Sequence, residues 1–199
     1  MSFDLTPATW QLWCLAALTL AMAMAIDADL RVRRIPNVLV LLVLAAGLVL
    51  NVIGPDNGRA GPLAPFPGAL GLGSALLGVL VGLTFFLPLH LVHAMGAGDV
   101  KLLAALGAFL GSVEVINVAL FILMAGGVLA VARMLWSGTS RRVLANVRLA
   151  MSAMVGGGQR FDPTTQSADR MPYALAFAGG LASYGYWRFV GGNPLISLG

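Results

Sequence analysis

The chain of 199 residues is 59% hydrophobic and only 10% charged, with a mean hydropathy of +0.89. Soluble globular domains carry about 25% charged residues, so this composition excludes a soluble domain and indicates a polytopic membrane protein. The net charge of +4 does not indicate a nucleic-acid partner, because arginines in a membrane protein first report its topology. The single cysteine, Cys14, excludes both a disulfide framework and a CxxC metal site.

Apolar runs long enough to cross a membrane divide the chain, since about 20 apolar residues span the hydrocarbon core. The run from Leu102 to Trp136 is too long for one span and is interrupted at Gly107, Gly111 and Glu114, so we divide it in two. The sequence predicts an all-α membrane protein with about six transmembrane helices, in one domain over 1–199. The predicted helices are 10–28, 37–53, 68–92, 100–111, 115–136 and 172–190.

Two further patterns concern packing and the long polar segment. Small residues recur in the third run at spacings that let helices approach closely. They are Gly68, Gly71, Gly73, Ser74, Gly78 and Gly82.

The polar segment 137–171 contains apolar residues near helical spacing beside arginines, which predicts a cytoplasmic loop with a helix lying on an anionic membrane surface.

The lysines and arginines give the orientation. With six spans, ten of them fall on one side of the membrane and only Arg59 and Arg188 on the other, so the first side is predicted to be cytoplasmic. The first helix then ends, and the fourth begins, on that face. Asp29 and Asp99 are therefore predicted to lie at the same depth, at the cytoplasmic boundary.

An ionisable side chain at the end of a membrane segment indicates function, because it is costly near hydrocarbon unless it is paired. Two carboxylates close together in a poorly solvated site share one proton and titrate as a unit. Such a pair suits peptide hydrolysis, with one member activating water and the other protonating the carbonyl oxygen. Gly96 and Gly98 beside Asp99 permit unusual backbone conformations and the close passage of a substrate strand.

These residues resemble the motifs of a known family. The sequence Gly-Ala-Gly-Asp at 96–99 fits the GxGD signature of intramembrane aspartyl proteases, and with Lys101 it resembles the "GxGDxKLL" form of type IV prepilin peptidases. Asp29 lies seven residues before Pro36 and Asn37, as does the first catalytic aspartate before the family's "IPN" turn. Residues 171–176 are similar to the "PYGxA" start of its last helix, with Ala174 in place of the usual Gly.

The resemblance implies a membrane aspartic endopeptidase of the short form associated with Flp-type or tight-adherence pili, with Asp29 and Asp99 catalytic. Gly96, Gly98, Lys101, Pro36 and Asn37 are the supporting motif residues. It implies removal of a short basic leader from a prepilin or pseudopilin, after a glycine, at the cytoplasmic face of the bacterial inner membrane. The longer members' CxxC insertion is lacking, so no N-methyltransferase activity is expected. We expect membrane lipid as a partner and no nucleic acid, cofactor or essential metal, and leave homo-oligomerisation open.

Several alternatives stay open at this point. Asp27 competes with Asp29 for the catalytic position, although it is better explained as a partner of Arg31, one turn away, or of Arg34. Asp99 could instead cap a helix and neutralise Lys101. A metal on His90 and His93 is a weak hypothesis, because a nearby second acidic ligand is lacking. Glu114 is expected to be solvated in a short outer turn.

Two other functional classes also fit paired membrane carboxylates. One is a small transporter or proton-conducting subunit, which would place its acidic groups near mid-bilayer. The other is a non-catalytic subunit of a secretion assembly, which would tolerate Asp99→Asn with little loss.

Overall fold

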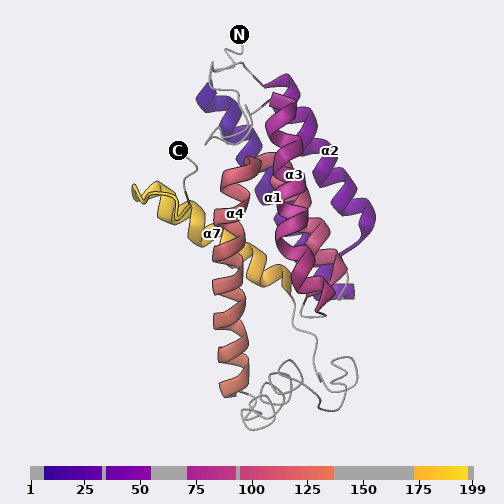
Figure 1. Ribbon diagram of the computed structural model, residues 1–199, viewed down its shortest axis with the longest axis vertical. Helices are drawn as coiled ribbons and strands as arrows, with labels where there is room; N and C mark the ends of the chain where they lie inside the picture. Colours follow the sequence, from indigo (N-terminus) through magenta and orange to yellow (C-terminus); the bar gives the residue numbers. More distant parts are fainter. Residues whose placement is uncertain (1–6, 33–34, 55–70, 93–94, 137–172, 197–199) are drawn as a thin grey trace.

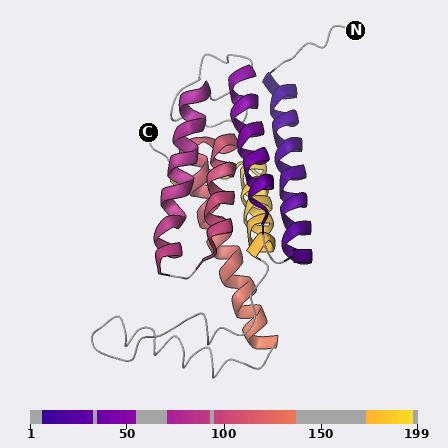
Figure 2. The same cartoon turned by 90° about the vertical axis from the view of Figure 1, so that its right-hand side faces the viewer.

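The computed structural model describes residues 7–32, 35–54, 71–92, 95–136 and 173–196. In these ranges all regular structure is helical, in five helices: α1 (Pro7–Val32), α2 (Asn37–Ile53), α3 (Gly71–Leu91), α4 (Ala97–Trp136) and α7 (Tyr173–Phe189). Helices α1 to α4 lie side by side, and α7 runs obliquely to them (Figure 1 and Figure 2). The predicted segment 137–171 with its surface helix lies outside the described residues.

Helix α4 has 40 residues, about 60 Å at 1.5 Å per residue, which is roughly twice the hydrocarbon core. Gly111 interrupts it with φ 79° and ψ 178°, a conformation that only glycine adopts readily. The chain reverses there, so a first arm (97–110) and a second arm (112–136) run in opposite directions (Figure 1 and Figure 2). The predicted division of this run is confirmed, and the five helices contain six helical segments.

Glycines set the contact between α3 and the first arm of α4. A Cβ atom added at Gly78 would lie 2.0 Å from the carbonyl oxygen of Gly107, and one added at Gly107 would lie 2.1 Å from that of Gly78. One turn further, a Cβ at Gly82 would lie 2.7 Å from the Leu103 carbonyl oxygen. Small residues thus bring the two backbones into direct contact, as the spacing in the third run predicts.

The outer surface of the bundle is apolar. Helices α1, α3 and α4 are each long and apolar enough to cross a membrane, and α2 is a shorter apolar helix. Leu12, Leu41 and Leu80, on α1, α2 and α3, are each more than half exposed. Such a surface suits lipid, where a large apolar area outside the protein carries no penalty. The protein is an all-α polytopic membrane protein, as predicted.

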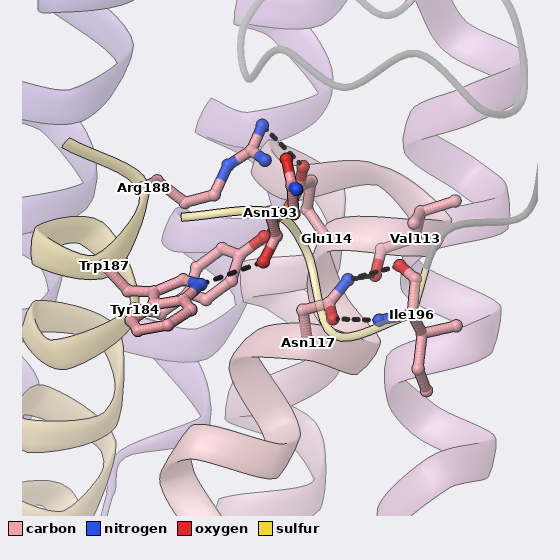
Figure 3. A network of polar contacts seen from close by, with 8 residues as sticks. All are labelled: Val113, Glu114, Asn117, Tyr184, Trp187, Arg188, Asn193 and Ile196. Atoms are coloured by element: carbon pink, nitrogen blue, oxygen red, sulfur yellow. Dashed lines mark hydrogen bonds and ion pairs between the residues drawn. The ribbon is translucent and has the colours of Figure 1, made fainter. Parts of the chain in front are cut away.

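A polar network joins α4 and α7 just after the reversal at Gly111 (Figure 3). Glu114 is only 4% exposed; it accepts a hydrogen bond from the Tyr184 hydroxyl and forms an ion pair with Arg188 at 3.5 Å. The expectation that Glu114 is solvated is therefore wrong. A buried carboxylate in an apolar bundle requires such partners, and both come from α7, about 70 residues later in the chain.

The residues after α7 extend this network. The Asn117 side chain donates to the Ile196 carbonyl at 3.0 Å and accepts from the Ile196 N–H at 2.9 Å, while the Trp187 indole donates to the Asn193 carbonyl at 2.8 Å (Figure 3). Ile196 is thus bonded through its backbone to the second arm of α4, and Asn193 through its carbonyl to α7.

Removing the Glu114 carboxylate should destabilise the fold. In Glu114→Ala the buried Tyr184 hydroxyl and the Arg188 guanidinium lose their partner, which costs about 1–3 kcal/mol of unfolding free energy. Arg31→Ala removes an exposed pair with Asp27 and should cost about 0–1 kcal/mol. Denaturant titration of both variants in the same detergent compares the two. Equal losses would mean that the network adds no more than a surface ion pair.

Candidate active site

Asp29 lies in the last turns of α1 and points into the bundle. The residue is 9% exposed, and its Oδ2 atom accepts a hydrogen bond from the backbone N–H of Ala174 at 3.0 Å. Ala174 is the second residue of α7, so this N–H belongs to the set that a helix leaves unpaired at its N-terminus. The carboxylate satisfies that donor and lies at the positive end of the α7 dipole.

Asp99 lies in the first turn of α4, at the same end of the bundle. It is 7% exposed, its backbone N–H donates to the Gly96 carbonyl at 3.1 Å, and its carboxylate accepts a hydrogen bond from the Gly96 backbone. The Asp29 charge acts directly on the Asp99 carboxyl group. Two carboxylates 70 positions apart in sequence therefore lie buried at the same end of the bundle, close enough for the charge of Asp29 to act on Asp99.

Asp27 and Asp29 lie on opposite sides of α1, one exposed and one buried. Asp27 is on the outside of α1, where its side chain is 58% exposed and its Oδ1 atom pairs with the Arg31 Nε at 2.6 Å. The expected partnership of Asp27 with Arg31 is confirmed; Arg34 lies outside the described residues. Because residues two apart on a helix point in nearly opposite directions, only Asp29 faces Asp99.

The two motif glycines act differently from the expectation. Positive φ occurs in the described residues at Gly71, Gly111 and Gly191, so neither Gly96 nor Gly98 has the left-handed backbone that other residues avoid. A Cβ at Gly96 would lie 3.1 Å from the Asp99 Oδ2 atom, tighter than ordinary contacts. Gly96 therefore leaves space beside the carboxylate. A Cβ at Gly98 would make an ordinary contact, 3.6 Å from the Ile35 Cβ.

The remaining motif residues meet at the start of α2. Pro36 precedes α2 with φ −63°, and its carbonyl accepts the first helical hydrogen bond from the Val40 N–H. Asn37, the first residue of α2, accepts a hydrogen bond on its side-chain oxygen from the Lys101 ammonium at 3.1 Å. Lys101 therefore contacts the motif at Pro36 and Asn37. The alternative reading of Asp99 had instead paired the Asp99 carboxylate with Lys101.

The start of α7 is a part of the site that the sequence analysis did not assign. Ala174 contacts Asp29 through its backbone, and Tyr173 lies within electrostatic range of Asp99. The similarity of residues 171–176 to a family motif is the one sequence feature that points to this part of the site. The donor itself is a backbone N–H, which every residue except proline carries, so the residue type does not reveal it.

The described histidine of the hypothetical metal pair contacts the backbone. The His90 ring Nδ1 is 3.0 Å from the carbonyl oxygen of Met95, so this ring bridges the end of α3 to the segment before α4. His93 lies outside the described residues. Within the described ranges, no three His, Cys, Asp or Glu side chains lie together as metal ligands would.

Comparison with known proteins finds a matching family. The sequence model of the type IV leader peptidase family matches residues 14–131, which is 118 of the 199 residues and includes both aspartates. No curated protein matches the chain. No solved structure matches it either.

Proposed function

We propose that this chain, which belongs to the type IV leader peptidase family, is an aspartic endopeptidase that removes the short basic leader of Flp-like prepilins. The observation that supports the proposal most is that two buried carboxylates, Asp29 and Asp99, lie at the same end of an apolar bundle, within electrostatic range of each other. Neighbouring carboxylates in a poorly solvated site hold one proton between them, which supplies an acid and a base together.

In the proposed mechanism the pair brackets a water molecule and the scissile peptide bond. The ionised member takes a proton from the water while the water oxygen attacks the carbonyl carbon. The protonated member donates its proton to the carbonyl oxygen, and the intermediate then collapses with proton transfer to the leaving amine. The space that Gly96 leaves beside the Asp99 carboxylate would admit the substrate backbone.

The proposed location is the cytoplasmic face of a bacterial inner membrane. Ten of the twelve lysines and arginines belong to the side on which α1 ends and α4 begins, if six segments cross. We further propose that the protein has no N-methyltransferase activity, because the segment between α1 and α2 is too short for the CxxC insertion of longer family members and Cys14 is the only cysteine.

The experiment is leader removal by the purified protein in liposomes. The substrate is a short prepilin with a basic leader, a glycine and an apolar helix, scored by gel shift and mass. We expect a single cut after the glycine, at a rate that a chelator does not change, and no cut when that glycine is replaced by leucine. Absence of cleavage by the folded protein, or loss of activity in the chelator, would contradict the proposal.

A further inference from the structure

Two contacts join the start of α2 to the start of α4, and they come from residues more than 60 positions apart. The Lys101 ammonium donates to the Asn37 side-chain oxygen at 3.1 Å. Beside this bond, Gly98 faces Ile35, with only 3.6 Å between the Ile35 Cβ and an ideal Cβ built on Gly98. We call these two contacts the clasp.

The clasp matters because the helices that carry the aspartates barely touch each other. α1 packs against α7 and α2, and its direct contact with α4 is slight. The distance between Asp29 and Asp99 must therefore be fixed through other segments. α7 provides one such link, through the Ala174 N–H on Asp29. The clasp provides another, because the chain passes from Asp29 to Asn37 in only eight residues.

We propose that Asn37 and Lys101 are positioning residues, which hold the start of α2 against α4 so that Asp29 and Asp99 keep the separation needed to share one water. This inference rests on the proposed function and adds to it a role for the motif lysine. Lys101 is exposed, so an acidic group of the substrate is its alternative partner. The bond to Asn37 favours the positioning role, since a charged donor and an amide oxygen form a directed contact between the two motifs.

The first test is a mutant cycle with steady-state kinetics. Lys101→Met and Asn37→Leu should each lower kcat roughly 10- to 100-fold with little change in KM, because misplacing catalytic groups by about 1 Å has effects of this size. The double variant should be no slower than the slower single variant, since both remove the same bond. Lys101→Arg and Asn37→Asp keep a donor and an acceptor and should recover most of the loss.

Arg31→Met is the matched control. It removes an exposed cation from the same end of the bundle, and its partner Asp27 also lies on the outside of α1. We expect near wild-type kcat from it. If Lys101→Met instead raises KM at unchanged kcat, Lys101 binds substrate and the proposal is wrong. Additive losses in the double variant would equally overturn it.

A cross-link tests directly whether closing the clasp restores activity to the Lys101 variant. With Cys14→Ala, the variants Ile35→Cys and Gly98→Cys introduce the only two thiols, and their Cβ atoms fall within the range of about 3.5–4.5 Å for a disulfide. In a Lys101→Met background, oxidation should close the clasp covalently and raise kcat above that of the reduced protein. The same background without the introduced cysteines should not respond to the oxidant.

The outcomes separate this inference from the proposed function. Failure of the two cysteines to cross-link, or an oxidised protein no faster than the reduced one, would overturn the clasp while cleavage by the wild type continued. If the wild type cleaves no prepilin, the proposed function fails, and a disulfide between residues 35 and 98 still reports the contact.

Discussion

Asp99→Asn and Asp29→Asn are each expected to lower kcat for leader removal by at least about 100-fold, the usual contribution of a positioned acid or base. Asparagine keeps the shape of aspartate and removes the titrating group. In Asp29→Asn the amide oxygen can still accept the Ala174 N–H, so the contact between α1 and α7 persists and the loss reports chemistry rather than folding. Mass-verified cleavage rates with an unchanged circular dichroism spectrum measure the effect.

Asp27→Asn is the control within the same helix. Asp27 is mostly exposed, and asparagine retains an acceptor for Arg31, so the variant should cleave at nearly the wild-type rate. Loss of activity in Asp27→Asn together with activity in Asp29→Asn would reverse the assignment. Full activity in Asp99→Asn would remove the aspartic mechanism and favour the non-catalytic assembly subunit.

The sequence predicted the features that depend on span length and local pattern. The long run 102–136 had to reverse, because a helix of that length exceeds the hydrocarbon core, and Gly111 is the residue that permits the reversal. The two aspartates were predicted to lie at the same end of the bundle because Asp29 follows the first predicted span and Asp99 precedes the fourth. Counting the spans places both of these points on the same side of the membrane. The regular spacing of small residues in the third run likewise predicted that α3 approaches a neighbouring helix closely, as it does at Gly78.

The features it could not predict depend on contacts between distant segments. Glu114 looked like a turn residue beside Gly111, because its partners Tyr184 and Arg188 are on another helix. The donor to Asp29 is a backbone N–H of α7, which no residue type encodes. The bond between Lys101 and Asn37 joins two motifs that were each found separately. In each case the contact depends on how distant segments pack against each other, which the local sequence does not specify.

Gly78→Ala should be the most destabilising conservative substitution in α3. The added Cβ would lie 2.0 Å from the backbone oxygen of Gly107. The backbone fixes the positions of both atoms, so no side-chain rotation can relieve the clash. The helices would have to separate by more than an ångström, at a cost at or above the about 1–3 kcal/mol of ordinary overpacking. Denaturant titration in detergent, with the yield of folded protein from membranes, measures the loss.

Gly73→Ala is the matched control in the same helix, because a Cβ there meets nothing within 4 Å. Alanine is the better helix former, so this variant should be as stable as the wild type or more so. Equal destabilisation at both positions would mean that replacing any glycine of α3 destabilises the protein, and that the contact with Gly107 is unimportant.

The reciprocal variant tests the contact itself. Gly107→Ala places its Cβ 2.1 Å from the Gly78 carbonyl oxygen, so it should cost about as much as Gly78→Ala. Once one Cβ has forced the helices apart, the second meets less resistance, so the double variant should lose less than the sum of the singles. Gly107 lies eight residues after Asp99 on the same arm, and a displaced arm would move that carboxylate relative to Asp29. Folded protein recovered from either variant should therefore cleave more slowly than its Gly73→Ala counterpart.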